Sequence, residues 1–430
     1  MHRPICPVAC LATLADLGRC CVAGGGRSDE KKVRVLAEHS AAAIDFLFER
    51  GLNLSEIVQL GGHSAARTHR FAPTPEGRPV PVGFTIINTL RTHIEQQLSG
   101  YVTVKNKCLF QGLHADHRLR ADGVYVRCDA GETELLKGTV ILTSGGYAND
   151  HSDTSLLRQY VPDLEAYPTT NGPWATGDII KVLRKERSIS LVDMDQVQVH
   201  PTGFLDPKAP TFHTKFLAPE ALRGCGAILL NKEGKRFANE LGRRDYLTDK
   251  ILEFGWHYDN KDDNPMVAAM LLTDNVINKF GAPSAGFYKM KGLVVDVATL
   301  AGAAEHLGVG EQVLRETLKA YRAAKEDSED EFGKAVFPAA LEDDDHFYVA
   351  YITPTLHYCM GGIEIDTQAQ VLIDNNGVSE PLPGVYAAGE VTGGVHGRNR
   401  LGGNSLLECV VFGRIAGRKA AHYKPDDMYE

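Results

Sequence analysis

Apolar residues recur at intervals of three or four along several stretches of the chain, a spacing that predicts amphipathic helices. The first such helix is expected between an N-cap at Ser28 and a stop at Gly51. Its apolar face is expected to consist of Val33, Leu36, Ile44 and Leu47. Further helices are expected around 87–98, 274–280, 297–307 and 311–326, and the acidic runs 326–332 and 341–347 are expected to be solvated loops.

Shorter apolar runs predict strands. Those at 101–105, 108–113 and 123–129 are expected to form a small antiparallel layer. The stretch 138–150 predicts a buried strand that runs into the double glycine Gly145–Gly146, which is typical of a parallel strand ending at a nucleotide. Further along, residues 384–391 predict another short buried strand, and 402–421 predict a helix that begins at a polar, glycine-rich turn.

Composition and charge narrow the class of protein. The chain has 430 residues, enough for two domains with sizeable cores. Its net charge of −9 argues against a nucleic-acid or anionic-membrane surface, and the lack of any run of 18 apolar residues argues against a membrane span. Nine cysteines show neither a CxxC pair nor zinc spacing. We therefore expect Cys225, Cys359 and Cys409 to be buried free thiols in a reducing compartment, the cytoplasm or an organelle matrix, with no metal site.

Composition also changes along the chain. From about residue 196 to 358 the sequence is more charged and more helical, which indicates a second domain inserted into the first. The expected division is an atypical N-terminal segment at 1–26, one domain made of 27–195 and 359–430, and a second domain at 196–358. The segment 1–26 is open to interpretation as a poor signal peptide, a transit-like leader or an unusual start.

The stretch 353–420 combines 12 glycines with side chains suited to chemistry. Glycine lets backbone approach a ligand closely, and the N-terminus of the helix that follows favours an anion or a hydrogen-bond acceptor. The polar residues among these glycines are His357, Glu390, His396, Arg398, Arg400 and Asn404. Further candidates precede them, namely His200, Glu220, Arg223, Arg244 and Asp245.

Each of these residues alone has an ordinary explanation: a surface ion pair for Arg244–Asp245, for example, or a buried hydrogen-bonded histidine for His200. Taken together, three arginines and two histidines in an acidic protein suggest a site for a dicarboxylate. The planar guanidinium group binds a carboxylate through two parallel hydrogen bonds.

The motifs HYCMGGIEID, YAAGEVTGGVHGRNRLGGNSLLE and GRIAG resemble the C-terminal signature of the fumarate reductase/succinate dehydrogenase flavoprotein family, and especially its soluble, single-subunit fumarate reductases. The resemblance extends, with gaps, from about Glu38 to the C-terminus. It implies an α/β fold in which a Rossmann-like FAD-binding domain carries an inserted α+β capping domain. It also implies non-covalent FAD and reduction of fumarate to succinate, by hydride transfer from N5 of reduced FAD with protonation by an arginine.

The resemblance further implies roles for individual residues. Arg244 aligns with the proton donor to the substrate carbon, and Glu220 and Arg223 align with the relay that returns a proton to it. The residues that align with the holders of the substrate carboxylates are His200, His357 and Arg400. Those implied to contact FAD are Gly145, Gly146, Thr176, Gly177, Asp178, Glu390, Asn404, Ser405 and Leu406, although helix capping explains Thr176 and Asp178 equally well.

Two departures from the family pattern bear on these roles. Pro219 stands where soluble fumarate reductases commonly carry a hydroxyl residue before the glutamate, which weakens the relay assignment. The opening strand–GxGxxG–helix unit, whose N–H groups bind the FAD diphosphate, has no counterpart, because the glycines at 24–26 follow no convincing strand. We therefore expect an incomplete Rossmann-like domain, in a truncated product, a fragment, or a piece that needs another subunit for tight FAD binding.

Two classes of function follow. The first is a flavin-dependent fumarate reductase acting on fumarate or a similar four-carbon dicarboxylate, with L-aspartate oxidase and the succinate dehydrogenase flavoprotein as alternatives on the same scaffold. The second is a catalytically inactive remnant that acts through protein contacts. The electron donor is open between NADH through a fused or separate reductase, free reduced flavin and a cytochrome.

Overall fold

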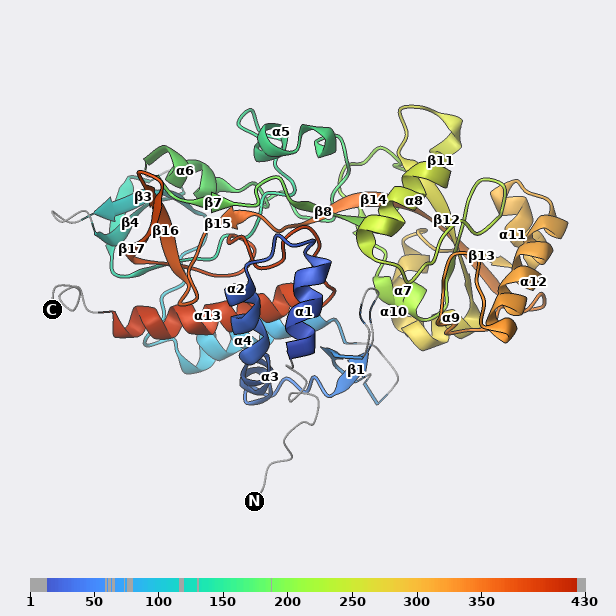
Figure 1. Cartoon of the computed structure of the whole chain (residues 1–430), viewed down its shortest axis with the longest axis horizontal. Helices are drawn as coiled ribbons and strands as arrows, with labels where there is room; N and C mark the ends of the chain where they lie inside the picture. The colour runs from blue at the N-terminus through green and yellow to red at the C-terminus, as the bar shows by residue number, and fades with distance from the viewer. Residues whose placement is uncertain are drawn as a thin grey trace, which may run out of the picture.

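The computed structural model describes residues 14–423, apart from 59, 61–62, 64–65, 73, 76–79, 116–119, 130 and 187. The chain forms two halves that lie end to end along the long axis of the molecule and are connected by the strands β8 and β14 (Figure 1). One half, which we call the split half, is built from chain segments before and after the other; its hydrophobic core runs from Leu36 to Val197 and from Leu356 to Ala416. The other, the inserted half, has its two cores between Phe204 and Ile352. These cores do not fix the expected domain boundaries to the residue. Residues 1–13 of the expected N-terminal segment at 1–26 lie outside the described residues.

A three-stranded sheet organises the split half. Its order is β16 (Gln370–Asn375), β17 (Val378–Ala387) and β6 (Val140–Leu142). β17 runs antiparallel to β16 and parallel to β6, so the two apolar strands expected from the sequence are confirmed and are neighbours. Within the described residues β6 pairs with no strand on its other side, and the Ile141 side chain there is 39% exposed.

An antiparallel layer packs beside this sheet, as expected. It consists of β3 (Cys108–Ala115), β4 (Ala121–Cys128) and β5 (Thr133–Lys137). The run 101–105 is not a strand: it is exposed and irregular, because it has no neighbouring strand to pair with. A disulfide joins Cys108 to Cys128, which occupy directly opposed positions of β3 and β4 and which the sequence analysis did not single out. Of the three cysteines expected to be buried thiols, Cys359 is buried, whereas Cys225 is half-buried and Cys409 is exposed.

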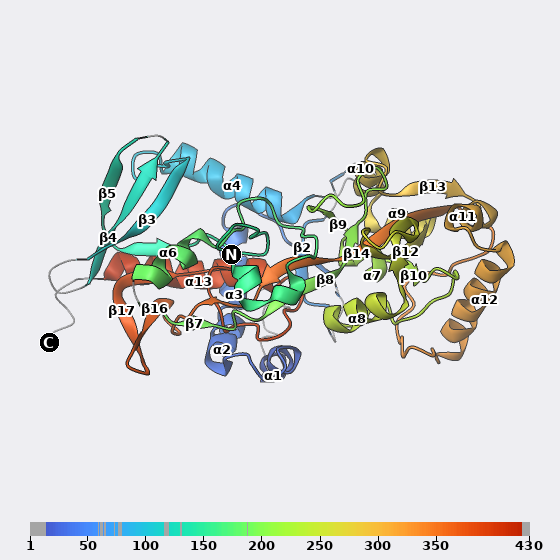
Figure 2. The ribbon, with the colours of Figure 1, turned by 90° about the horizontal axis from the view of Figure 1, so that it is seen from above.

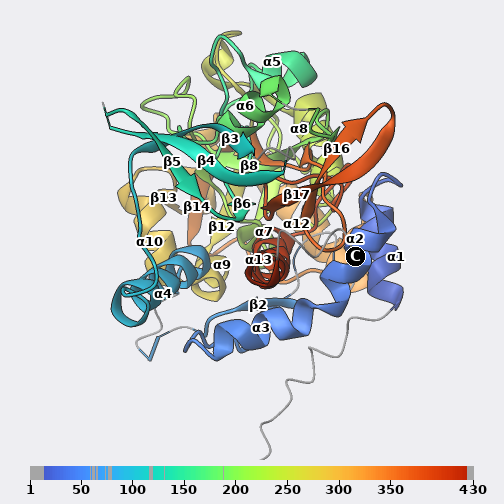
Figure 3. The ribbon, with the colours of Figure 1, turned by 90° about the vertical axis from the view of Figure 1, so that its left-hand side faces the viewer.

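Five helices pack around the sheet of the split half. They are α1 (Leu14–Ala23), α2 (Glu30–Glu38), α3 (Ser40–Phe48), α4 (Val82–Gln97) and α13 (Asn404–His422). α13 runs through the middle of this half, with α4 on one side and α1 and α2 on the other (Figures 2 and 3). The smaller elements are β1 (Glu56–Val58), β2 (Thr68–Arg70), α5 (Leu156–Tyr160), η2 (Pro162–Leu164), α6 (Asp178–Glu186), β7 (Leu191–Val192) and β15 (Gly362–Ile363).

The single helix expected between Ser28 and Gly51 is wrong in two details. Its N-cap is Asp29, whose carboxylate accepts the backbone N–H of Lys31 at 2.8 Å and thereby satisfies a free donor of the first turn. The helix is also interrupted at His39, which separates α2 from α3. At this break the Ser40 hydroxyl donates to the Ala37 carbonyl at 2.7 Å, a local bond of the kind that competes with the helical ladder.

The inserted half is built on a seven-stranded antiparallel sheet. Its main path is β10 (Ile228–Leu230), β12 (Met266–Thr273), β14 (Phe347–Cys359), β8 (Val197–Phe204) and β9 (Phe216–Leu217), while β11 (Trp256–His257) pairs with β12 and β13 (Val295–Ala298) pairs with β14. One face is covered by α7 (Glu220–Gly224), α8 (Arg244–Phe254), α9 (Asp274–Phe280) and α10 (Ala282–Met290). The other is covered by α11 (Leu300–Leu307) and α12 (Glu311–Asp327); the remaining element is η3 (Tyr258–Asn260). The helices expected at 274–280 and 311–326 are therefore confirmed, whereas the one expected at 297–307 begins only at Leu300, because Val297 and Ala298 end β13.

The acidic runs of the inserted half are only partly solvated loops. Asp330 belongs to one of these runs, yet its side chain is 1% exposed and lies 2.6 Å from the Arg236 guanidinium group. The expectation was wrong here because the sequence does not show that Asp330 pairs with the buried guanidinium group of Arg236, which lies far away along the chain. Among the described helices, none combines the length and apolar character that crossing a bilayer requires.

Candidate functional site

The two histidines of the candidate site come from the strands that connect the halves. β8 and β14 pair antiparallel, but Thr353 faces Gly203 whereas Thr355 faces His200, so β8 has one extra residue there. Farther along, Leu356 faces Val199 and Tyr358 faces Gln198, which makes His357 an extra residue of β14. The register therefore slips by one residue between the two bulges and then returns.

Bulges redirect side chains, and this pair brings two imidazole rings together. The ring centroids of His200 and His357 are 5.1 Å apart. Nδ1 of His200 contacts the backbone of Thr202, and Nδ1 of His357 lies 2.7 Å from the Thr170 hydroxyl. Each ring is thus oriented through Nδ1, and Nε2 is the atom that each can offer to a ligand.

Both histidines are held neutral. Burial is the main cause that lowers the pKa of His200 well below its usual value, and the nearby Arg244 adds to it. Burial likewise lowers the pKa of His357, with further contributions from Arg244 and Arg400. Two uncharged imidazoles lie beside two guanidinium groups, and that of Arg400 bonds to no carboxylate among the described residues, which favours an anionic ligand.

Arg244 connects the inserted half to these histidines. It is the first residue of α8, and its Nε and Nη2 lie 3.3 and 3.1 Å from Oε2 of Glu220 on α7. Nη1 donates to Oε1 of Gln198 at 2.6 Å. The Arg244 side chain is 11% exposed and that of Glu220 7%. The pair is therefore a nearly dry ion pair with a fixed geometry.

Arg223 follows Glu220 by three residues on α7, which places both on one side of this short helix. Its side chain is fully buried, and Nη1 donates to the backbone carbonyl of Glu240. Its Nε and Nη2 have no hydrogen-bond partner among the described residues, and burial lowers its pKa. Pro219 is the N-cap of α7 and, lacking a hydroxyl, makes no side-chain capping bond.

Arg400 approaches the site from the glycine-rich loop that precedes α13. Its guanidinium carbon lies 4.4 Å from the centroid of the Tyr358 ring, a cation–π contact, and Nη1 donates to the Leu401 carbonyl at 3.2 Å. The side chain is 3% exposed, and Nε has no partner within the described chain. Burial lowers the pKa of Arg400 to about 10, so it stays charged at neutral pH.

The residues expected to contact FAD fall into two places. Gly145 and Gly146 follow β6, and a Cβ at Gly146 would lie 2.6 Å from Oε1 of Glu390, so glycine is required for this close approach. Oε1 of Glu390 accepts the backbone N–H of Cys359 at 2.9 Å, and burial raises the pKa of Glu390 to about 7. Thr176, Gly177 and Asp178 lie instead at the start of α6, where the Thr176 hydroxyl donates to the Asp178 carboxylate at 2.9 Å and Asp178 lies in the first turn, a favourable place for a carboxylate.

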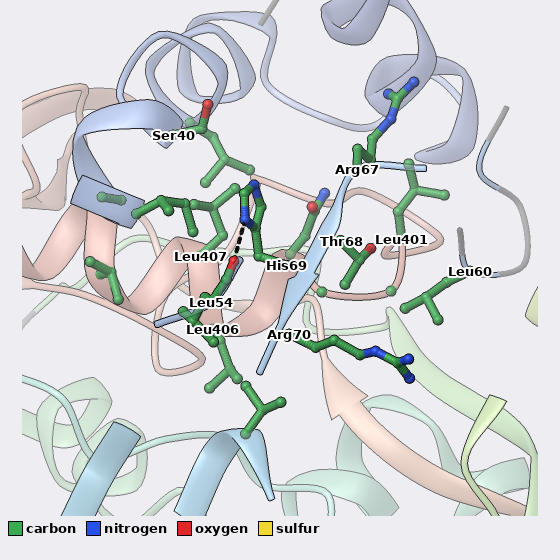
Figure 4. Close-up of a pocket in the computed structure, with 18 of the residues that line it drawn as sticks. Ser40, Leu54, Leu60, Arg67, Thr68, His69, Arg70, Leu401, Leu406 and Leu407 are labelled. Atoms are coloured by element: carbon green, nitrogen blue, oxygen red, sulfur yellow. Dashed lines mark hydrogen bonds between the residues drawn. The ribbon is translucent and has the colours of Figure 1, made fainter. Parts of the chain in front are cut away.

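The start of α13 borders a cavity of about 410 Å³, which lies between α2–α3 and α13 (Figure 4). Asn404 and Leu406 line it, and the amide of Asn404 lies 3.9 Å from the Cys20 sulfur. Ser405, between these two residues in the sequence, is half-buried. The cavity wall is mainly apolar, with Val33, Leu36, Ala41, Ile44, Leu47, Leu407 and Val410 among its members. The apolar stripe expected for residues 33–47 therefore borders this cavity, although Leu36 and Leu47 also belong to hydrophobic cores of this half.

The cavity reaches the polar site. Nε2 of His63 lies 3.0 Å from the carbonyl of Gly402, and a Cβ at Gly402 would lie 3.7 Å from Nη2 of Arg244. Gly402 and His63 both line the cavity, so an occupant at this end would lie next to Arg244. Residues 61–62 and 64–65, which flank His63, lie outside the described residues.

The structure adds residues that the sequence analysis did not single out. Gln198 bonds to Arg244 and also donates to Oδ1 of Asn399 at 3.0 Å and to the Arg400 carbonyl at 2.9 Å. Strand periodicity could have found it, because it precedes His200 by two positions and so shares its face. Thr170 and Tyr358 have no such signal: they are distant in sequence from the groups that they orient.

Comparison with known proteins gives one consistent result. The family model described as FAD binding domain matches residues 19–406. "Fumarate reductase" of Schizosaccharomyces pombe is 40% identical over 393 residues, covering 90% of this chain and 73% of that protein. "Fumarate reductase 1" of Saccharomyces cerevisiae is 36% identical over 411 residues, covering 92% and 83%. Among solved structures, the open conformation of a flavocytochrome c3 fumarate reductase matches with a TM-score of 0.70 at 30% identity, over 95% of this chain and 67% of that one.

The described residues fit FAD in part. The apolar cavity beside Gly402 suits a flat ring system, and the N-terminus of α13, which has no side-chain cap, offers N–H groups to its polar edge. A cradle for the diphosphate is not apparent within the described residues. The glycines at 24–26 connect α1 to α2 rather than a strand to a helix.

Proposed function

Because this chain belongs to the FAD-binding flavoprotein family of the fumarate reductases, we propose that it reduces fumarate, or a similar four-carbon dicarboxylate, to the saturated acid. Fumarate takes up two electrons and two protons to become succinate. The split half would be an incomplete Rossmann-like FAD domain, and the inserted half its cap. The observation that carries the proposal is that Arg244 and Arg400 meet His200 and His357 in one buried site.

His200, His357 and Arg400 would hold the two carboxylates. The guanidinium of Arg400 is buried, charged and has an unused Nε, so a carboxylate would complete its hydrogen bonds. Two neutral imidazoles can each donate one N–H without repelling the arginines. Such a clamp would hold the double bond in one orientation and polarise it.

Arg244 would deliver the proton to the substrate carbon. Arginine is a very weak acid, so this role requires a strongly basic reaction partner and a group that resupplies the proton at once. Glu220 lies 3.1 Å from Nη2 of Arg244 and would return a proton to it, with Arg223 behind. FAD, when bound, supplies the electron pair for the other alkene carbon as hydride. The groups that would hold it are Gly145, Gly146, Glu390, the start of α13 and the cavity wall.

The experiment begins with the FAD content of the purified chain, measured by absorbance, followed by oxidation of reduced methyl viologen on addition of fumarate. The wild-type chain is expected to bind FAD and turn over. Arg244→Ala is expected to lower kcat by about 10²–10⁴-fold while succinate binding, measured by calorimetry, persists. Arg243→Ala is the matched control, because Arg243 is its exposed neighbour and pairs with Asp245 at the surface.

Full activity of Arg244→Ala would remove Arg244 from the mechanism. A wild-type chain that binds FAD and succinate but turns over another dicarboxylate would redirect the substrate assignment. A chain that neither binds FAD nor turns over would contradict the proposal and favour the inactive remnant that acts through protein contacts. The dye assay makes each outcome independent of the natural electron donor.

A further inference from the structure

A buried carboxylate stands behind Arg400 without a role in the proposed chemistry. Glu408 lies in the second turn of α13 and is 1% exposed. Its Oε2 accepts the Tyr358 hydroxyl at 2.6 Å and lies 2.8 Å from Nε2 of His396. The Thr392 hydroxyl lies 3.4 Å from Oε1, the longest of these contacts. One carboxylate therefore connects α13 to β14 and to the loop after β17.

The Arg400 guanidinium group packs against the ring of Tyr358. The guanidinium lies over this ring, and its nitrogens make one hydrogen bond within the described residues, the 3.2 Å bond from Nη1 to the Leu401 carbonyl. Since Nε lacks a partner, the ring position largely sets where the guanidinium lies. The ring position in turn depends on the hydroxyl, which Glu408 holds from the far side.

Electrostatics favour the same arrangement. Burial alone would raise the pKa of Glu408, but His396 and the Tyr358 hydroxyl outweigh it and keep the pKa below its usual value. The carboxylate is therefore charged at neutral pH. Its negative charge, together with Tyr358 and Glu390, opposes the loss of the Arg400 proton that burial promotes.

We infer that Glu408 is a positioning residue for the dicarboxylate site: it orients Tyr358, and Tyr358 holds the Arg400 guanidinium toward His357. The inference rests on the proposed function, because the ligand is the carboxylate assigned there to Arg400. It also accounts for a charged residue placed among the apolar residues of α13, where an unpaired carboxylate would be costly.

The test uses Glu408→Gln, which keeps the side-chain size, and Tyr358→Phe, which keeps the ring and removes the hydroxyl. Arg400 acts on the bound carboxylate before and during the reaction, so each variant is expected to raise KM and the succinate Kd by about 10-fold or more with kcat within about threefold. Arg244→Ala is expected to show the opposite split. The double variant is expected to equal the stronger single variant, because both changes break one connection.

Thr392→Val is the matched control. It removes the longest contact to the same carboxylate, together with a 2.8 Å bond to the Gly389 carbonyl, and leaves Tyr358 bonded, so the succinate Kd is expected to stay within twofold. Glu408→Asp is expected to restore part of the affinity lost in Glu408→Gln. A succinate Kd that is unchanged in Glu408→Gln, or single effects that add in the double variant, would overturn the inference.

A second measurement needs no substrate. Phenylglyoxal modifies exposed arginines, and peptide mass mapping would report the labelling rate of Arg400, which is expected to be slow in the wild-type chain because the residue is buried. Releasing the ring should speed labelling of Arg400 several-fold in Glu408→Gln and not in Thr392→Val. An unchanged rate contradicts the positioning role. If instead labelling responds but the wild-type chain binds no dicarboxylate, the proposed function fails while the contact holds.

Discussion

The two halves of the molecule differ in how completely their polar and apolar groups are partnered. In the inserted half the sheet is covered on both faces, and residues 267–272 of β12 are at most 1% exposed. Its most buried acid, Glu240, accepts from Arg236 at 2.9 and 3.1 Å and from Lys334 at 2.8 Å. Arg236 also bonds to Asp330. The charges of this cluster are therefore neutralised locally, whereas buried Arg223 of the same half keeps Nε and Nη2 without a partner among the described residues.

The split half is arranged differently. Within its described residues β6 has an open edge, α2–α3 and α13 enclose an apolar cavity, and Arg400 keeps an unpartnered Nε. The half-buried acid Glu390 of this half accepts a hydrogen bond from the Cys359 amide and has a raised pKa. The difference teaches that the Glu240 cluster satisfies its charges through its own contacts, whereas Arg400 and the cavity wall of the split half leave a donor and an apolar surface open among the described residues.

The variant with the largest expected effect on this contrast is Glu240→Gln. The change keeps the shape of the side chain but leaves Lys334 and Arg236 buried with the single carboxylate of Asp330, so we expect a loss of about 3–5 kcal/mol in the free energy of unfolding. Urea denaturation followed by far-ultraviolet circular dichroism would measure it. Glu253→Gln is the control, because its partner Lys250 is at the surface and no measurable change is expected. Equal effects of the two variants would break the comparison.

A pair of leucines sharpens the same contrast in apolar packing. Leu272 of β12 is fully buried within the core of the inserted half, so Leu272→Ala is expected to cost about 2–5 kcal/mol. Leu407 of α13 faces the cavity and already lacks neighbours on that side, so Leu407→Ala is expected to cost about 1–2 kcal/mol, with its cavity surface reducing the loss. Chemical denaturation of both variants gives the difference. Similar costs would mean that the cavity wall is as well packed as the core.

The last expected effect concerns pH. Burial places the pKa of Glu390 at about 7 in the folded chain, above the usual value of 4.5, so the folded state holds the proton more tightly than the unfolded state. Its contribution to stability is therefore full below about pH 4.5 and is lost as the pH rises through 7, by about 3 kcal/mol for the difference of about 2.5 between the pKa values of 4.5 and 7. Glu240 has the opposite sign, because Lys334 and Arg236 lower its pKa despite burial.

Glu390→Gln carries no titrating group and is expected to remove this decline between pH 5 and 8, as measured by urea midpoints at several pH values. Glu380→Gln, on the exposed part of β17, is the control and should leave the decline intact. A wild-type chain whose stability does not fall over this range would show that the Glu390 carboxyl is better solvated than its burial implies.

Much of the fold was predictable from local pattern. The helices α9, α11, α12 and α13 and the strands β6 and β17 follow from periodicity and from glycine stops, because each signal is contained within its own segment. The break at His39 was not predictable, since the apolar stripe continues across it and the competing Ser40 bond leaves no mark on the pattern. The cavity was missed for a related reason: an apolar stripe shows what a helix can bury, not whether anything covers it.

The candidate site was also only partly predictable from local sequence. Its members His200, His357, Arg244 and Arg400 were found through motifs, and the structure brings them together, while their chemical roles stay a prediction. The contacts that orient them were not found. Glu408 and Tyr358 are 50 residues apart, and neither the helix nor the strand pattern indicates that they meet. Long-range contacts of this kind depend on how elements pack, which local periodicity does not encode.

The two offset bulges between β8 and β14 have a consequence for how this protein tolerates insertions and deletions. Loss of one residue from either bulge alone would leave the register permanently shifted, and every later side chain of β14 would turn to the opposite face of the sheet. Loss of one residue from each strand, Pro201 from β8 and His357 from β14, would restore a regular ladder and keep the inserted half intact. A protein with both deletions would keep its architecture but lose the paired histidines of the ligand site. Selection for the ligand site would therefore constrain the length of these two strands as it constrains the identity of the side chains.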